Sequence, residues 1–233
     1  MVPHPKLQQR TSKGATWSEV LQHVTGGYTV TANNLVNGPG FAYRPIPEAT
    51  SQPTIKPRNI ILHTNAGQKS AASLWAWITR ATVNGEPHFQ IGFDGAEQYM
   101  PLNRRADCNY SANLWSYAGV TYGAVSFETQ DLGAATVNST PWTARQLQLM
   151  IAAITCICVT YAVQCVQPAT WDASGIGHHS LHPFQGPMRK AWTNVVGKIC
   201  PGRARIAQMD YVRAKVGENL AEFARQTGWQ CGT

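Results

Sequence analysis

Side chains that bind metal ions occur at three separate places in this sequence. His63 follows a short apolar run, His178 and His179 lie in a glycine-rich segment, and Cys200 precedes a proline. Imidazole nitrogen and thiolate are ligands of tetrahedral zinc, and a catalytic zinc has three protein ligands and one open position. Two histidines and one cysteine from these places would form such a shell.

The spacing of these residues differs from that of a zinc finger. His179 lies 116 residues after His63, and Cys200 lies 21 residues after His179, whereas the ligands of a finger follow one another closely. Each residue also has a structural alternative. A histidine at a strand end is commonly a hydrogen-bonded polar group, and a cysteine before proline is commonly a small apolar side chain. Spacing alone leaves both interpretations open.

An α/β fold is expected to bring the three places together. A buried strand is predicted at Asn59–Leu62, where a β-branched apolar run stops at polar residues. A hairpin follows, with strands at His88–Phe93 and Glu97–Met100, and a further strand is predicted at Ala124–Glu128. Strands that alternate with helices are typical of α/β proteins.

Three amphipathic helices are predicted between and after these strands. The first covers residues 70–82, with Leu74 and Trp77 on its apolar face. The second opens with the capping box Thr143-x-x-Gln146 and reaches residue 163. The third covers residues 205–226 and has a glycine just beyond its end. The segment before it, residues 167–202, is predicted to be a loop.

Length and composition indicate a single globular domain with a loosely structured start. The chain has 233 residues, against about 100–200 for a typical domain. Prolines and paired glycines interrupt residues 1–57, so we expect an N-terminal extension or linker there and the catalytic domain over residues 58–233. Only a short helix at Trp17–Val24 and a short strand at Tyr28–Thr31 are predicted within that extension.

The charge balance narrows the choice of partners. Nineteen Lys and Arg against twelve Asp and Glu give a net charge of +7, which favours anionic partners such as wall polymers, membrane surfaces or nucleic acid. The basic residues are scattered, so we expect no nucleic-acid partner. No stretch resembles a signal peptide or approaches the ~18 apolar residues of a membrane span, so we expect no membrane insertion.

The six cysteines lack the regular spacing of a secreted disulfide framework. We therefore expect reduced thiols and synthesis in a cytoplasm without a signal peptide.

Five short motifs resemble, in the same order, those of zinc-dependent N-acetylmuramoyl-L-alanine amidases of the type-2 amidase and peptidoglycan-recognition family. The resemblance covers about residues 58–208, and residues 192–208 are most similar to amidase domains of endolysins from phages of actinobacteria. The five motifs are IILHT at 60–64, HFQIGFDGAEQ at 88–98, AVSFE at 124–128, WTARQL at 142–147 and KICPG at 198–202.

The resemblance implies a central mixed β-sheet flanked by helices, and one Zn²⁺ held by His63, His179 and Cys200. The family pattern Ile-x-x-His selects His179 as the second ligand. The adjacent His178 remains an alternative, and His182 is the third candidate in the same loop.

The same resemblance implies catalytic roles for two further residues. Glu128 would take a proton from the attacking water and deliver it to the departing alanine nitrogen, and the Lys198 ammonium would stand beside the oxyanion. Their structural alternatives are an exposed strand-end acid and a solvated loop lysine. In many relatives a Tyr before the hairpin assists catalysis, but here Glu86 and Pro87 precede His88 and that Tyr is absent. We expect His88 either to be a hydrogen-bonded strand residue or to assist Glu128 in proton transfer.

The activity implied is hydrolysis of the amide between N-acetylmuramic acid and L-alanine in bacterial peptidoglycan. We expect a monomeric phage endolysin, an antimicrobial hydrolase that is made in the host cytoplasm and reaches the cell wall after membrane permeabilisation. The alternatives are a peptidoglycan-binding module that does not cut, which would lack Cys200, and a nucleic-acid binder with a clustered basic face. Five aromatic residues could line a glycan groove or the core: Trp75, Trp77, Trp115, Tyr117 and Tyr122.

Overall fold

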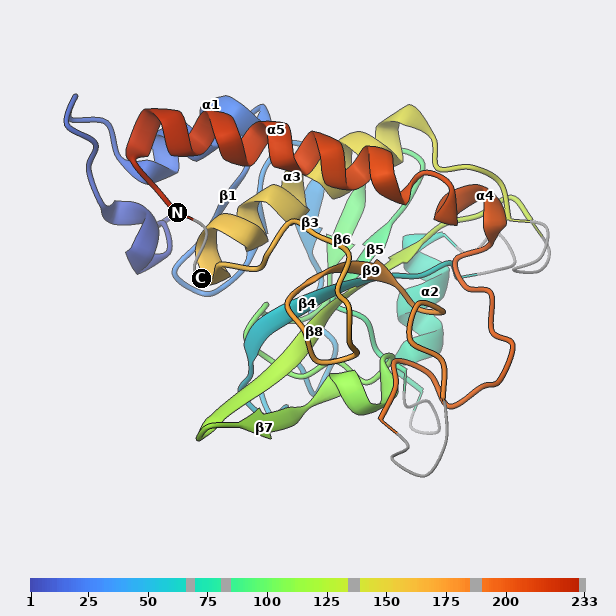
Figure 1. The fold of residues 1–233 in the computed structure, drawn as a ribbon. Helices are drawn as coiled ribbons and strands as arrows, with labels where there is room; N and C mark the ends of the chain where they lie inside the picture. Colours follow the sequence, from blue (N-terminus) through green and yellow to red (C-terminus); the bar gives the residue numbers. More distant parts are fainter. Residues whose placement is uncertain (66–69, 81–84, 134–138, 185–189, 231–233) are drawn as a thin grey trace.

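A seven-stranded mixed β-sheet forms the centre of the computed structural model, which describes residues 1–65, 70–80, 85–133, 139–184 and 190–230 (Figure 1). Helices lie against the sheet, so the expected α/β fold with a mixed central sheet and flanking helices is confirmed. In sheet order, with β7 (Trp115–Tyr117) paired to β8, the strands are β3 (Phe41–Tyr43), β6 (Ala96–Gln98), β5 (Phe89–Ile91), β8 (Val120–Thr129), β4 (Lys56–Leu62) and β9 (Gly175–His178).

Strands β8, β4 and β9 run parallel, so their carboxyl ends meet at one end of the sheet. β4 lies between β8 and β9, and Leu62 stands opposite Phe127 on one side and His178 on the other. The predicted hairpin is confirmed as the antiparallel pair β5 and β6, although both strands are shorter than expected. Residues that follow β4 and β9, and those that end β8, therefore become neighbours.

Strand β9 lies inside the segment that was expected to be a loop, so that expectation is wrong at residues 175–178. Its sequence, GIGH, has two glycines and lacks the alternation that marks a strand. The structure explains Gly177, because a Cβ atom there would lie 2.6 Å from the ring of Trp192. The strand forms here despite the low strand propensity of glycine, because the small residue allows the Trp192 indole to pack closely on β9.

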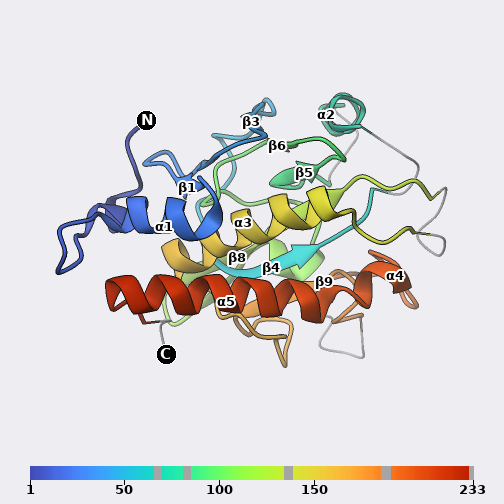
Figure 2. The same cartoon turned by 90° about the horizontal axis from the view of Figure 1, so that it is seen from above.

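Three helices cover one face of the sheet: α1 (Trp17–Thr25), α3 (Ala144–Tyr161) and α5 (Met209–Thr227) (Figures 1 and 2). The main core lies between them and side chains such as Ile60, Leu62 and Phe127. The predicted capping box is confirmed, since Thr143 Oγ1 accepts from the Gln146 N–H and the Gln146 side chain accepts from the Thr143 N–H.

One helix, α3, is long and apolar enough to cross a membrane by length and composition, with a mean hydropathy of 1.3 over 18 residues. The expectation that no segment approaches that length is wrong in this respect. However, 67% of the helix is buried inside the protein, between the sheet and α5. A core helix of a globular protein has this position.

The last predicted helix is divided into α4 (Arg203–Ile206) and α5. Gln208 lies at the junction, where its side chain accepts from the Trp142 N–H at 2.7 Å and donates to the Trp142 carbonyl at 3.2 Å. The glycine that ends α5 is confirmed as a left-handed cap, with φ of 73° at Gly228.

The opposite face of the sheet carries α2 (Ala71–Ile78) and the short 3-10 helix η2 (Tyr110–Asn113). The first predicted helix begins as expected but ends at residue 78, and part of its predicted end, residues 81–82, lies outside the described residues. Trp77, predicted on its apolar face, is 38% exposed, while Leu74 is buried.

The first 57 residues pack on the same core as the sheet and its helices. Leu7, Leu21 and Val30 are buried in the main core, and β3 pairs in parallel with β6. Tertiary burial holds these short elements despite the prolines and glycines between them. That residues 1–57 extend a catalytic domain stays a prediction. The further elements here are η1 (Pro5–Gln8), β1 (Thr29–Val30) and β2 (Val36–Asn37).

Candidate metal centre

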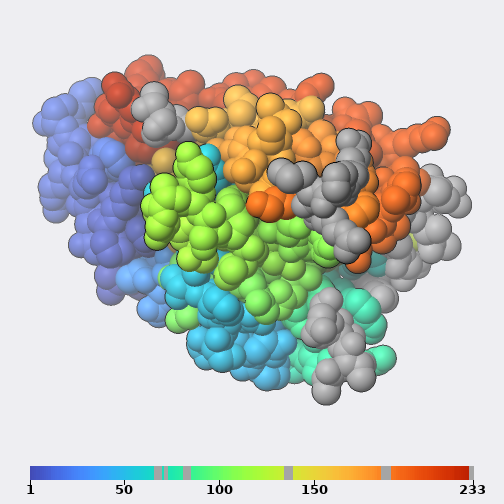
Figure 3. Space-filling model, turned by 60° about the horizontal axis from the view of Figure 1, so that its bottom comes forward, coloured from blue at the N-terminus to red at the C-terminus, as the bar shows by residue number. Residues whose placement is uncertain are grey.

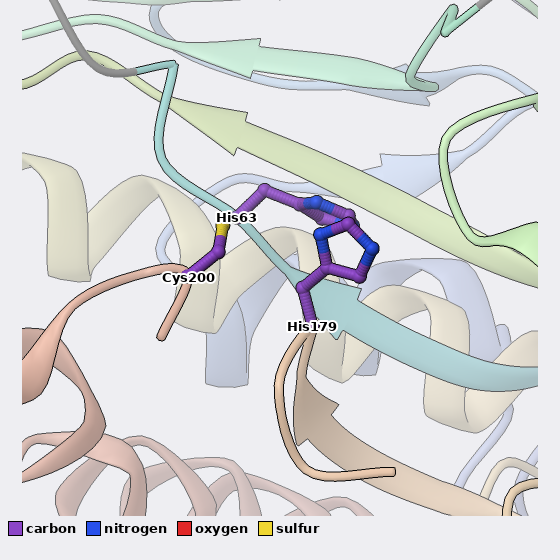
Figure 4. A group of neighbouring side chains, drawn as sticks. All are labelled: His63, His179 and Cys200. Carbon is purple, nitrogen blue, oxygen red and sulfur yellow. The ribbon is translucent and has the colours of Figure 1, made fainter. Parts of the chain in front are cut away.

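The three predicted metal ligands meet at the carboxyl ends of the parallel strands β4 and β9. His63 directly follows β4, His179 directly follows β9, and Cys200 comes from the loop before α4 (Figure 4). All three are buried, and one potential ligand atom from each lies within 4.8 Å of the others. The two imidazole rings are 4.1 Å apart, centroid to centroid. The fold therefore brings together residues that are 116 and 21 positions apart in the chain.

Strand geometry explains why His179, rather than His178, joins this cluster. His178 pairs with Leu62, and successive side chains of a strand point to opposite faces. His63 and His179, each one position later, therefore share the face opposite to the helices. His178 Nδ1 is 3.0 Å from the Ser180 hydroxyl instead, and the cluster found among the described residues does not include it.

The third candidate, His182, is also held elsewhere. Its Nε2 lies 3.1 Å from the Pro168 carbonyl oxygen, and its ring packs edge-on against Trp192 at 4.8 Å. Within the described residues it is not part of the cluster.

Burial keeps both clustered imidazoles in the uncharged form that binds metals. It lowers the pKa of His63 to about 3, although the hydrogen bond with Asn109 opposes this shift. Burial also lowers the pKa of His179 well below its ordinary value, assisted by His63 and the Lys198 ammonium. At pH 7 both rings are neutral, so each has a lone pair available.

The Cys200 thiol has a raised pKa, so its uncharged form is not the form that binds a metal ion. Burial, and next the Glu128 carboxylate, raise its pKa to about 12, while the Thr64 N–H, which points at Sγ from 3.4 Å, opposes the shift. Without a cation the buried sulfur keeps its proton, because a thiolate ligand forms in exchange for that proton.

The donor set fits a metal ion on one further observation. Among the described residues, His179 Nδ1 is buried and has no hydrogen-bond partner. Buried polar atoms of this kind are rare and need an explanation such as an ion that the atom binds. Two imidazoles and a thiolate are the ligand types of zinc.

Glu128 and Lys198, the two predicted catalytic residues, line the same cavity as the ligands. Glu128 lies near the end of β8, and its Oε1 is 3.6 Å from His63 Nδ1. Lys198 is half-buried in the loop before Cys200, and its charge contributes to the lowered pKa values of His63 and His179. The cavity therefore holds a carboxylate and an ammonium group beside the cluster.

The cavity has a volume of about 500 Å³ and lies between η2, α2 and the loop after β9. Figure 3 shows the face on which these green, teal and orange segments come together. Of the five aromatic residues that could line a groove, only Trp77 is found among the described residues of its wall. Further wall residues that were not predicted for the site are Tyr110, Asn113, Thr193 and Asn194, of which the last two lie in the 192–208 stretch that carries the family resemblance.

His88 is a hydrogen-bonded structural residue, which was the first of the two expectations for it. Its Nδ1 accepts from the Ser126 N–H at 3.2 Å, and its Nε2 is 2.8 Å from the Arg104 carbonyl oxygen. Both ring nitrogens are used, and burial lowers the pKa to about 4. His88 therefore has no free nitrogen with which to assist Glu128.

A buried ion pair that sequence reasoning missed lies beneath the cluster. The side chains of Arg205 and Asp131 are both fully buried, 3.5 Å apart. Thr64, whose N–H contacts Cys200, donates its hydroxyl to Asp131 and accepts from Arg205 at 3.0 Å. Thr129 accepts from Arg205 at 2.6 Å and donates to the His63 carbonyl. The ion pair thus connects the segments that carry two of the ligands.

Comparison with known proteins gives similarity in structure but not in sequence. No protein-family model and no curated protein matches this chain. The Staphylococcus aureus hydrolase AmiA, solved in complex with its ligand, matches with a TM-score of 0.53 at 12% identity, covering 98% of this chain and 100% of that one. At this identity the match shows a shared fold.

Two further solved structures match more weakly. The catalytic domain of XlyA has a TM-score of 0.49 at 16% identity and covers 76% of this chain and 99% of its own. The N-acetylmuramoyl-L-alanine amidase LysC from Clostridium intestinale URNW has a TM-score of 0.49 at 14% identity and covers 77% and 98%.

Proposed function

We propose that this protein is a zinc-dependent N-acetylmuramoyl-L-alanine amidase that cuts bacterial peptidoglycan between the muramic acid lactyl group and L-alanine. The observation that carries the proposal is the convergence of His63, His179 and Cys200 beside Glu128 in one cavity. The AmiA-like fold and the order of the five sequence motifs support the same activity.

His63, His179 and Cys200 would hold the Zn²⁺ ion. Three protein ligands are the number found at catalytic zinc sites, which keep one position for water or substrate. The chemistry that zinc supplies in such a shell, when bound, is Lewis-acid activation of water and of a carbonyl oxygen.

Glu128 is the residue that moves protons. Its carboxylate is placed in the cavity at the end of β8, 3.6 Å from a ligand nitrogen. It takes one proton from the water whose oxygen bonds to the lactyl carbonyl carbon, and it gives that proton to the alanine nitrogen as the carbon–nitrogen bond breaks. The products are a lactyl carboxylate and a peptide with a new amino terminus.

Lys198 stabilises the negative charge that develops on the carbonyl oxygen. An ammonium group inside a partly buried cavity acts more strongly on such a charge than one in water does. Asn113, Thr193 and Asn194 present amide and hydroxyl groups on the cavity wall, which suit a substrate made of peptide and sugar.

We further propose that the enzyme is a monomeric phage endolysin, made in the host cytoplasm and acting at the wall after membrane permeabilisation. The five motifs, especially residues 192–208, support this source. The net charge of +7 supports binding to an anionic wall. The scattered basic residues are the reason that we propose no nucleic-acid partner.

The test is zinc content together with the release of new alanine amino termini from purified peptidoglycan. We expect one zinc per chain, amine release by the untreated protein, loss of release after chelation, and recovery with added zinc. A protein that binds peptidoglycan but releases no amine with zinc bound would be a recognition module, and the proposal would be wrong.

A further inference from the structure

The imidazole of His63 has a different neighbour at each nitrogen. Nε2 lies 2.8 Å from Asn109 Oδ1, and both groups are buried. Nδ1 lies on the other side of the ring, 3.6 Å from Glu128 Oε1. The nitrogen left for a metal ion is therefore Nδ1.

We propose that Asn109 is a positioning residue, which holds His63 as the Nε2–H tautomer so that the Nδ1 lone pair faces the metal position. The proposal rests on the metal site of the proposed function. A neutral imidazole carries a proton on one nitrogen and a lone pair on the other. A ligating histidine is commonly oriented through a hydrogen bond from its second nitrogen.

The amide of Asn109 is itself held in place. Its Nδ2 donates to the Ser126 hydroxyl at 2.5 Å, which turns Oδ1 toward His63. Its backbone N–H donates to Asn113 Oδ1 at 2.6 Å. Ser126 lies on β8 two residues before Glu128, so Asn109 spans from η2 to the strand that carries the carboxylate.

The opposite amide orientation makes a contrary prediction. An Asn109 NH₂ group facing His63 would donate to Nε2 and leave the proton on Nδ1, where it would point at the metal position. That tautomer could not bind a metal through Nδ1. The two orientations of the Asn109 amide are therefore distinguished by whether His63 carries its proton on Nε2 or on Nδ1.

The first experiment reads this tautomer in the zinc-free protein by long-range ¹H–¹⁵N correlation spectra of the histidine rings. We expect His63 to carry its proton on Nε2, and a His63 protonated on Nδ1 would overturn the proposal. The Asn109→Asp variant keeps an oxygen acceptor and should keep the tautomer. The Asn109→Leu variant lacks the acceptor and should populate both tautomers.

The second experiment measures the zinc dissociation constant by competition with a chromogenic chelator. We expect Asn109→Leu to weaken zinc binding by about 10–100-fold and Asn109→Asp to restore most of it. Wild-type affinity in Asn109→Leu would overturn the proposal. The matched control is Asn59→Leu, which removes another fully buried asparagine, one that donates to Trp171 and Ala173 carbonyls, and should leave zinc affinity unchanged.

These measurements separate this proposal from the proposed function. Neither uses peptidoglycan, and the wild-type spectrum decides the tautomer even if Asn109→Leu fails to fold. If zinc-loaded wild type released no alanine amino termini while His63 kept its Nε2 proton, the amidase activity would be wrong and the role of Asn109 would stand.

Discussion

The chemistry of this protein depends on which face of a strand each side chain occupies. His63 and Glu128 follow Leu62 and Phe127, which stand opposite each other in β4 and β8. Because successive side chains of a strand point to opposite faces, Leu62 and Phe127 face the apolar core, while His63 and Glu128 face the cavity. At the residue scale, therefore, a single position separates a core side chain from a proposed metal ligand or a proposed proton carrier.

Replacing Glu128 by Gln should separate metal binding from hydrolysis. The amide has nearly the same shape but cannot accept a proton, so we expect zinc content to remain at one per chain and amine release to fall by at least about 100-fold. Zinc analysis and amine release measure both. Glu97→Gln is the control, because it makes the same substitution of glutamate by glutamine on β6, where Glu97 pairs with Arg44. We expect this variant to keep its activity. Substantial activity in Glu128→Gln would remove Glu128 from the mechanism.

Replacing Cys200 by Ala should release zinc and loosen the loop before α4. The third ligand is lost, and a ligand that binds only the folded state stabilises it in proportion to its affinity. We expect zinc to raise the melting temperature of wild type but not of Cys200→Ala. Cys165→Ala, which changes a half-buried thiol near α5, should respond to zinc like wild type, and unchanged zinc content in Cys200→Ala would show that the ligand set is wrong.

At the scale of elements, the site depends on two features that hold the strand ends together. Strand β9 packs so closely against Trp192 that a Cβ atom at residue 177 would lie 2.6 Å from the indole ring. The Arg205–Asp131 pair joins α4 to the segments after β4 and β8 through Thr64 and Thr129. Both features lie within a few residues of a ligand.

The Gly177→Ala variant should be less stable than wild type by about 1–3 kcal/mol. The added methyl group would lie 2.6 Å from the Trp192 ring, so the indole or β9 has to move. Urea unfolding gives the free energy of unfolding. Gly217→Ala in α5 is the control of opposite sign, because alanine is the better helix former and the nearest atom is 4.0 Å away. Equal stability of the two variants would contradict the close packing.

The Arg205–Asp131 pair predicts a specific loss of stability in acid. Burial alone would raise the pKa of Asp131, but the Gly133 and Thr140 N–H groups and Arg205 lower it below its ordinary value. The carboxylate therefore stabilises the fold fully above its unfolded pKa of about 3.9, and this contribution is lost as the pH falls through the lower folded pKa.

Asp131→Asn should cost about 3–5 kcal/mol at pH 7, because it leaves the buried Arg205 charge unpaired. The difference between variant and wild type should shrink below about pH 4. Chemical unfolding from pH 3 to 7 measures it, and a difference that is independent of pH would contradict the ion pair.

At the scale of the whole molecule, the N-terminal segment and the face that carries the candidate metal centre belong to one folded unit. The match to AmiA covers 98% of this chain, so it includes most of the first 57 residues as well as the site. Those residues add α1 to the helical layer and β3 to the sheet.

Wall binding should weaken as salt increases. A net charge of +7 attracts an anionic wall, and added salt shortens the range of that attraction from about 10 Å at 0.1 M to about 3 Å at 1 M. Sedimentation of the Glu128→Gln protein with purified cell walls measures binding without hydrolysis. Binding that is the same at low salt and at about 0.5 M salt would show that charge has no part in it.

Local pattern was sufficient to predict the elements with strong signals. The capping box at Thr143, the apolar strand before His63 and the glycine after α5 were all predicted from neighbouring residues, because caps and short apolar runs are satisfied locally. The short helix α1 and strand β1 were also predicted from local pattern. Strands β2, β3 and β9 were not, since they are held by pairing and burial against distant parts of the chain.

The sequence by itself determined which residue types were available for a metal site and proton transfer, and the motif order suggested His63, His179, Cys200 and Glu128. Only the tertiary structure decided that these side chains meet, because parallel pairing of β4, β8 and β9 sets the register that joins them. The same register selected His179 over its neighbour. Asn109 and the buried ion pair carried no local signal, since hydrogen bonds between residues far apart in the chain exist only after folding.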